Sequence, residues 1–193
     1  MLDFDQAVSW KALEERRDRT ESPRQRQLLQ VVIDHVKAEV ARSLDGLMAT
    51  LVAEPDYHFW IDGKDRGPKG YDGVRSYYEA FVRGGGAVFE SIKERIVVDD
   101  DTISHEGPVR NLVSGAIAKA RGYTVPDAAG HYLVTFRNVV WWSFDEAGLA
   151  LGEDSYTTKD PDDWARIADE DLPQCYVDYL AEIGKLDVAP PAA

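Results

Sequence analysis

The sequence predicts a single-domain α+β fold, in which a strongly curved antiparallel sheet wraps around N-terminal helices and encloses a pocket. Helical patterns dominate the first half of the chain, and a run of long strand patterns follows from residue 87 to residue 158. Helices that are segregated from a run of strands are typical of α+β domains rather than of doubly wound parallel sheets. The 193 residues suffice for one domain with a sizeable core.

Two helices are expected first. Residues 3–19 have an amphipathic pattern, and Ser22 with Pro23 forms a typical helix start because serine caps the N-terminus and proline fits the first helical position. The second helix is expected to reach about Arg42. Its apolar residues recur at helical spacing on one face, at Leu29, Ile33, Val36 and Val40.

A short helix, a short strand and a third long helix follow. Ser43 can cap a helix in LDGLMATLV, and the aromatic-rich segment YHFWID at residues 57–62 is typical of a strand. Asp72 is expected to cap the helix GVRSYYEAFV, which the glycines of RGGG at residues 84–86 end.

The strand region is predicted from alternation and turns. Residues 87–99 and 102–115 flank three aspartates that form a hairpin turn, and Gly107 with Pro108 suggests a bulge or bend. The segment at residues 131–144 is the longest strand, and the turn DEAG leads to the last strand. The segment at residues 162–184 returns to a helical pattern, broken near its proline.

Composition excludes several classes of partner. The net charge of −13 opposes binding to phosphate backbones and to anionic membranes. No apolar run approaches the ~18 residues of a membrane span, and the N-terminus does not resemble a signal peptide, so we expect a cytoplasmic protein. The single cysteine, Cys175, permits neither an internal disulfide nor a cysteine-rich metal site. Because no nucleotide-binding or metalloprotease motif occurs, the sequence predicts neither a cofactor nor a metal.

Acid–base candidates come from strand positions beside aromatic residues. His58 shares one strand face with Trp60, whereas Tyr57 shares the other face with Phe59. Histidine titrates near neutral pH without assistance, so His58 is the first candidate; a core histidine bonded to a backbone carbonyl is the alternative.

The last strand offers adjacent acids. Asp154 and Glu153 must face opposite sides, so at most one enters the pocket. Asp154 is preferred because it shares its face with the small residues Ala150 and Gly152 and with Tyr156. Glu153 is the less favoured choice, and a solvent-facing acid at the end of a strand is the alternative for Asp154.

Further candidates would hold the oxygen atoms or the rings of a ligand. Arg110 could stabilise an oxyanion, or it could form a salt bridge on a sheet face. His105 could line the pocket or lie on the surface. The aromatic candidates, for which a core position is the alternative, are Tyr57, Trp60, Tyr77, Tyr78, Trp141, Trp142 and Tyr156. One member of each adjacent pair is expected to face inward.

Four segments together resemble the SnoaL-like branch of the nuclear transport factor 2-like superfamily. They are the paired helices ending in LDGLMATL, the strand YHFWID, the helix GPKGYDGVRSYYEAF and the hairpin VVWWSFDEAGLALGEDSY. The resemblance covers about residues 24–158, so residues 1–22 and 160–188 are expected to be helical additions within one domain, 1–193. It implies a cone-shaped α+β fold and enzymes that work without metals or organic cofactors.

The resemblance also implies a function. We expect a cofactor-independent lyase or dehydratase acting on a hydroxylated aromatic or polycyclic small molecule, such as a lignin-derived aromatic dimer, with His58, Asp154, Arg110 and Tyr78 in catalytic roles. The same residues permit an isomerase, a cyclase or an epoxide hydrolase, and a non-catalytic binding domain is a further alternative. Members of the superfamily often dimerise through the open sheet, so a homodimer or other small homo-oligomer is expected.

Overall fold

The computed structural model describes residues 1–84, 86–158, 160–161 and 163–184. The helices are α1 (Val8–Asp18), α2 (Pro23–Val40), α3 (Leu44–Met48), α4 (Gly70–Arg83), α5 (Gly115–Ala120) and α6 (Gln174–Ile183). The strands are β1 (His58–Ile61), β2 (Lys64–Asp65), β3 (Phe89–Ser91), β4 (Arg95–Val98), β5 (Thr102–Ser114), β6 (His131–Phe144), β7 (Ala150–Thr157) and β8 (Asp163–Ile167).

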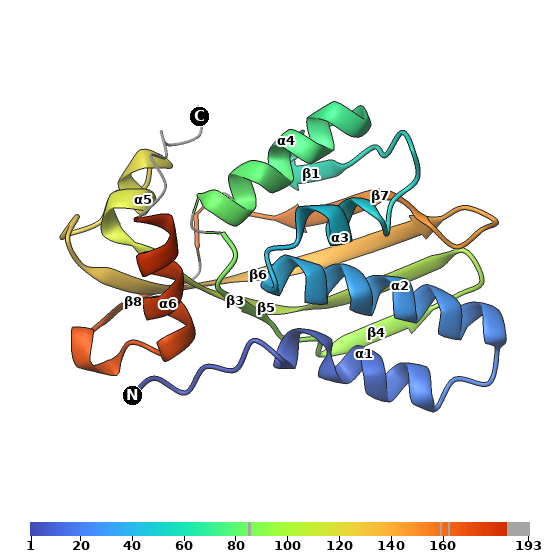
Figure 1. Ribbon diagram of the computed structural model, residues 1–193, viewed down its shortest axis with the longest axis horizontal. Coiled ribbons are helices and arrows are strands. Elements are labelled where there is room, and N and C mark those ends of the chain that lie inside the picture. The colour runs from blue at the N-terminus through green and yellow to red at the C-terminus, as the bar shows by residue number, and fades with distance from the viewer. Residues whose placement is uncertain (85, 159, 162, 185–193) are drawn as a thin grey trace.

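The strands form one twisted sheet, and α1 to α4 pack against one of its faces (Figure 1). The hydrogen-bonded order is β2-β1-β7-β6-β5-β3, with β4 also on β5 and β8 also on β6. Most pairs are antiparallel, but β1 joins β7 in parallel, with His58 opposite Asp154. The predicted α+β class with a curved, mainly antiparallel sheet is confirmed.

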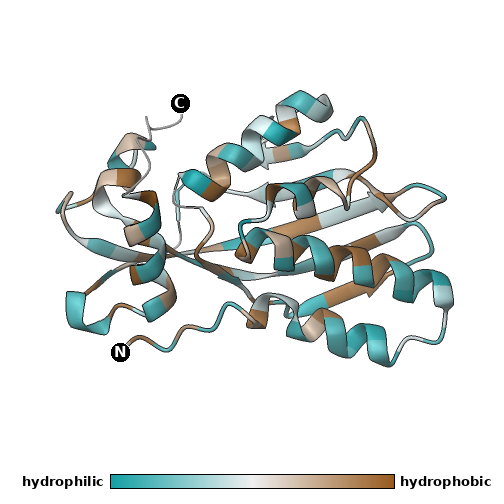
Figure 2. Cartoon of the chain, in the orientation of Figure 1, coloured by the Kyte–Doolittle hydropathy of each residue, from teal (hydrophilic) through white to brown (hydrophobic). Residues whose placement is uncertain are grey.

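Helix α2 follows the predicted signals and forms the centre of the helical layer. The Ser22 hydroxyl accepts a hydrogen bond from the Gln25 amide, and Pro23 occupies the first helical position. The helix buries a continuous apolar face against the inner side of the sheet. Figure 2 shows hydrophobic residues on both α2 and the strands behind it. Burial of this face, rather than helix propensity alone, stabilises the helix.

The edge of β5 carries two strands where the sequence suggested one. The expected strand at residues 87–99 is split into β3 and β4, and both pair with β5. Residues 92–94 cross between them opposite Gly107, where an added Cβ atom would lie only 2.0 Å from the Ile92 carbonyl oxygen. The bulge or bend that the sequence suggests at Gly107 therefore lies in the facing segment, residues 92–94, and not in β5. Strand β5 itself pairs with β6 without a register shift.

The C-terminal region differs from the helical prediction. Residues Asp163–Ile167 form β8, which pairs with the first part of β6. This part of β6 has a free edge because β7 pairs only with Val139–Phe144. Trp164 packs there against Tyr123 and Tyr132. Helix α6 follows as expected, whereas residues 185–193 lie outside the described part of the chain.

Helix α4 begins at Gly70, so Asp72 lies in its first turn and is not its N-cap. None of the helices in the described ranges is long and apolar enough to cross a membrane.

Candidate active site

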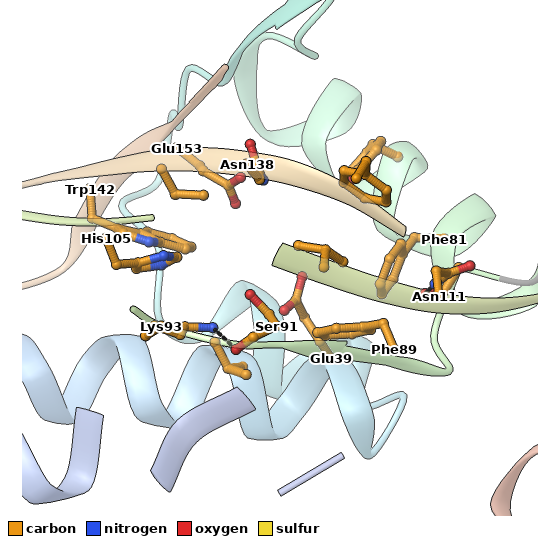
Figure 3. A pocket seen from close by; sticks show the side chains of 16 residues that line it. Glu39, Phe81, Phe89, Ser91, Lys93, His105, Asn111, Asn138, Trp142 and Glu153 are labelled. Atoms are coloured by element: carbon orange, nitrogen blue, oxygen red, sulfur yellow. Dashed lines mark hydrogen bonds between the residues drawn. The ribbon is translucent and has the colours of Figure 1, made fainter. Parts of the chain in front are cut away.

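A cavity of about 170 Å³ lies between the helical layer and the inner face of the sheet (Figure 3). Helices α2 and α4, strands β3, β5, β6 and β7, and residues 86 and 93 contribute side chains to it. Its apolar walls are Val36, Phe81, Phe89, Val109, Phe136, Val140 and Trp142. Its polar groups are Glu39, Tyr77, Ser91, Lys93, His105, Asn111, Asn138 and Glu153.

Strand alternation directs most of the polar groups inward. His105, Val109 and Asn111 point to the cavity from β5 because alternate residues share a face. Trp142 lies opposite Glu153 in the β6–β7 pair, so these two residues share that same inner face. The sheet therefore supplies a rigid support for the groups that would meet a ligand.

Glu39 enters the cavity from the opposite side, on the last turn of α2. It lies three residues after Val36 and four after His35, so it lies on the same inward side of the helix and is half-buried. Figure 3 shows Glu39 approaching from the helical layer and Glu153 from the sheet. Two carboxyl groups thus face one cavity from different layers.

Burial perturbs both carboxyl groups. Desolvation raises the pKa of Glu39 to about 8, and the nearby charge of Glu153 adds to this effect while Lys93 opposes it. Desolvation likewise raises the pKa of Glu153 to about 7, with Lys93 opposing the shift and Asp154 adding to it. Between these two values, Glu153 is mainly ionised and Glu39 mainly protonated, so one can accept a proton while the other donates one.

The basic groups of the cavity are also shifted toward neutrality. Desolvation lowers the pKa of Lys93 to about 8, against the opposing charges of Glu39 and Glu153. Desolvation and the charge of Lys93 hold the pKa of His105 well below its usual value. His105 is therefore a neutral imidazole at physiological pH, which can accept one hydrogen bond and donate another.

Two buried polar atoms of the lining have no hydrogen-bond partner within the described part of the chain. They are the side-chain oxygen Oδ1 of Asn138 and the indole nitrogen Nε1 of Trp142. Buried polar atoms are almost always bonded, so such a pair calls for an explanation. A ligand with both a donor and an acceptor would satisfy an amide oxygen and an indole N–H.

Three of the predicted ligand-contacting residues line the cavity: Tyr77, His105 and Trp142. In each adjacent aromatic pair, one member lines the cavity. Trp142 is 3% exposed and Trp141 is 47% exposed, and Tyr77 lines the cavity whereas Tyr78 does not.

Tyr78 and Tyr57 belong to a buried hydrogen-bonded chain instead of the cavity wall. The imidazole of His35 bonds to the Thr50 hydroxyl and to the Tyr78 hydroxyl, each at 2.6 Å, and Tyr78 bonds in turn to the Tyr57 hydroxyl at 3.0 Å. Burial lowers the pKa of His35 to about 3, so this imidazole is neutral. The His35 ring also packs against the ring of Trp142, with centroids 4.9 Å apart.

The catalytic positions expected for His58 and Asp154 are corrected by the structure, which places both on the outer face of the sheet. The His58 imidazole is 2.7 Å from the Asp65 carboxylate and stacks on Trp60, which stacks on Tyr156. Asp154 shares this face. The predicted alternation along each strand is correct, but the sequence does not show which set of residues meets the helices.

Arg110 also lies away from the cavity, so its expected role at a ligand oxygen is corrected. Its guanidinium pairs with the buried Glu90 carboxylate at 2.6 Å and lies over the Phe4 ring. Glu90 accepts a hydrogen bond from the Asp5 amide as well. These contacts fasten the N-terminal segment to the sheet, which is the salt-bridge alternative for Arg110.

The sequence patterns did not identify three residues of the cavity, namely Glu39, Lys93 and Asn138. They also favoured Asp154 over Glu153. Glu39 continues the helical spacing of Leu28, Val32 and His35, so a stripe that includes polar residues at this spacing reveals it. Lys93 keeps the alternation of Phe89 and Ser91 beyond the end of β3. For Glu153, the prediction was wrong only in the choice of the strand face that meets the helices.

Comparisons with solved structures support this architecture. A candidate SnoaL-like polyketide cyclase from Shewanella putrefaciens CN-32 aligns with a TM-score of 0.58 at 13% identity, over 88% of this chain and 94% of that one. One from Jannaschia Sp. CCS1 aligns with a TM-score of 0.55 at 14% identity, over 72% and 90%. The epoxide hydrolase/cyclase-like enzyme SalBIII of salinomycin pyran ring formation aligns with a TM-score of 0.50 at 10% identity, over 75% and 92%.

These likenesses define the class of fold. The chain has the cone-shaped SnoaL-like, nuclear transport factor 2-like fold, and enzymes are among the proteins that share it.

No protein-family model matches the sequence, and no curated protein matches it either. In the described ranges, no group of three or more His, Cys, Asp or Glu side chains is arranged to hold a metal ion.

Proposed function

We propose that the protein is a cofactor-independent enzyme of the lyase or dehydratase type, which acts on a hydroxylated, ring-containing small molecule by general acid–base catalysis. The observation that carries this proposal is the pair of half-buried carboxyl groups, Glu39 and Glu153, which line one aromatic-walled cavity. A general acid or base is most effective when its pKa is near the working pH, and burial brings both groups there.

The chemistry follows from the different pKa values of the two groups. Ionised Glu153 removes a proton from a carbon atom of the ligand, and the electron pair of that C–H bond forms a double bond. Protonated Glu39 donates its proton to the hydroxyl group on the neighbouring carbon, which leaves as water. Asn111, Asn138 and Tyr77 are positioned along the cavity to hold further ligand oxygens.

The size of the cavity limits the part of the ligand that it encloses. A cavity of about 150 Å³ lined by apolar side chains accommodates benzene, so about 170 Å³ suits one six-membered ring with small substituents. The rings of Phe81, Phe89 and Phe136 offer flat apolar contact for it. A polycyclic compound or an aromatic dimer would have to extend its second ring through the opening.

A turnover screen tests this proposal. The protein is incubated in a metal chelator with hydroxylated aromatic compounds of one and two rings, and products are followed by ultraviolet absorbance and mass. Loss of the mass of water with new conjugation is expected for a dehydratase. Unchanged mass would indicate an isomerase or cyclase, and a gain of water from an epoxide would indicate a hydrolase.

Two variants and a matched control locate the reaction. Glu153→Gln and Glu39→Gln are each expected to lower kcat by about 10²–10⁴-fold, which is the usual contribution of a general acid or base. Asp154→Asn changes the adjacent acid on the outer face and should retain full activity. Full turnover in both glutamine variants, or saturable binding without any turnover, refutes the catalytic assignment.

The outer face of the sheet supports a separate proposal, that two copies of the chain pair through it. Trp141 is 47% exposed and Tyr156 is 45% exposed, and Trp60 stacks on Tyr156. Aromatic side chains gathered on an exposed face are typical of protein interfaces.

A further inference from the structure

Lys93 is a buried lysine without an ion-pair partner in the described part of the chain. The residue is 9% exposed, and no described carboxylate oxygen lies within 4.0 Å of its Nζ atom. The Nζ atom donates one hydrogen bond, to the Ser91 carbonyl oxygen at 3.0 Å. An ammonium group carries three donors, so a charged Lys93 would be poorly satisfied here, whereas a neutral amine also keeps a lone pair for a ligand.

The backbone fixes this amine in the cavity. Lys93 lies in the crossing between β3 and β4, where the chain passes close over Gly107. Figure 3 shows the Lys93 side chain entering the same space as the carboxyl groups of Glu39 and Glu153. A structural counter-ion would contact one of these carboxylates, but the lysine instead bonds to a backbone carbonyl.

We propose that Lys93 is a covalent nucleophile, whose Nζ atom condenses with the carbonyl carbon of an aldehyde or ketone bound in the cavity. The lone pair of the nitrogen forms a C–N bond as the π bond of the carbonyl group breaks, and one proton passes from the nitrogen to the carbonyl oxygen to give a neutral carbinolamine. Glu39 protonates that hydroxyl group and becomes a carboxylate, water leaves, and a protonated imine to Lys93 remains. The step is reversible and needs no oxidant or reductant.

This inference rests on the proposed function and names its substrate class, a β-hydroxy aldehyde or ketone that carries a ring. A protonated imine withdraws electrons, so the adjacent C–H bond becomes acidic enough for Glu153 to remove the proton. Glu39, which regains a proton from solvent water after the imine has formed, then protonates the β-hydroxyl group, and this group leaves as water. A second water hydrolyses the conjugated imine and restores the amine of Lys93.

The surroundings of Lys93 favour a reactive amine near neutral pH. Its titratable neighbours in the cavity are Glu39 on α2, Tyr77 on α4, His105 on β5 and Glu153 on β7. Burial lowers the pKa of Lys93 to about 8, so about one molecule in ten carries the neutral amine at pH 7. For a lysine with the ordinary pKa of 10.5, the fraction is roughly one in 3,000.

Reductive trapping tests the proposal. The full chain is incubated at pH 7 with benzaldehyde, which fits the cavity but has no hydroxyl group to lose, and sodium cyanoborohydride reduces any imine to a stable amine. We expect the first benzyl group to attach to Lys93, located by peptide mass mapping of the unaltered protein. Its labelling should be at least about tenfold faster than that of the exposed Lys119, since the cavity holds the ring of the aldehyde beside Lys93 and burial lowers the pKa of this lysine to about 8.

Variants separate this inference from the proposed function. Lys93→Met should abolish the fast label, whereas Lys119→Met is the matched control and should retain it. Labelling of Lys93 no faster than that of Lys119 in the unaltered protein overturns the inference, whatever the stability of the variants. If Lys93→Met keeps its dehydratase turnover while Glu153→Gln loses it, the acid–base proposal survives and the imine does not. Fast labelling of Lys93 without turnover of any substrate supports the nucleophilic amine and refutes the acid–base proposal.

Discussion

Glu153→Gln is expected to make the protein more stable at neutral pH while it removes activity. Glu153 titrates at 4.5 when it is exposed and at about 7 when it is buried in the fold. Because the folded value is higher, the unfolded chain ionises first, so the wild type loses stability as the pH rises from 4.5 to about 7. The difference between these two pKa values corresponds to about 3 kcal/mol, and glutamine, which cannot ionise, avoids this loss.

Urea unfolding at two pH values measures this effect. The excess stability of Glu153→Gln over the wild type should be about 1 kcal/mol at pH 5 and about 3 kcal/mol at pH 8. Asp154→Asn, on the outer face, serves as the control and should change the free energy of unfolding by less than about 0.5 kcal/mol at both pH values. An excess that does not grow with pH, or a glutamine variant less stable than the wild type at pH 8, would refute the burial of an acid in this cavity.

Four other predictions test separate features. The pH profile of kcat/KM should be a narrow bell with apparent limbs near 7 and 8, since one cavity carboxyl must be ionised and the other protonated; a flat profile from pH 6 to 9 contradicts this. Tyr78→Phe should cost about 1–3 kcal/mol in urea unfolding, because it leaves a nitrogen of His35 unpaired; a neutral effect argues against the buried chain. Gly107→Ala should cost more than about 3 kcal/mol, since its Cβ atom would clash with the Ile92 carbonyl; an unaltered melting curve disproves the close crossing. Trp141→Asp should convert a dimer that pairs through the outer face of the sheet to a monomer in sedimentation velocity, because it places a charge on that face. A monomeric wild type refutes the pairing proposal.

The sequence predicts the fold better than it predicts the site, and the reason is physical. Helix α2 and the long strand β6 have strong local signals, namely a capped start with a one-faced stripe in α2 and a long segment rich in β-branched and aromatic residues in β6. Strand β8 was missed because its pairing depends on the free edge of β6, which is far away in the sequence. Local patterns do not report on such distant partners.

The residues of the candidate site depend even more than β8 on contacts between distant segments of the chain. Alternation separates His58 from Tyr57 and Asp154 from Glu153 correctly, but the choice of face depends on where the helices pack. A preference for histidine and for small neighbours therefore selected the outer face. Lys93 is still harder to find, since its inward direction depends on a crossing outside any strand. Contacts between distant segments, and not residue types, decide which ionisable groups become buried.

The parallel pairing of β1 with β7 has a consequence for the order of folding. The pair joins His58 to Asp154, which are 96 positions apart (154 − 58), whereas the hairpin of β4 and β5 closes a turn of only three residues. Closure of a long loop costs entropy before its contacts contribute, so such pairs tend to form late. We therefore expect β1 and β2 to be the last strands to join the sheet, and their amides to exchange hydrogen with solvent sooner than those of β5 and β6.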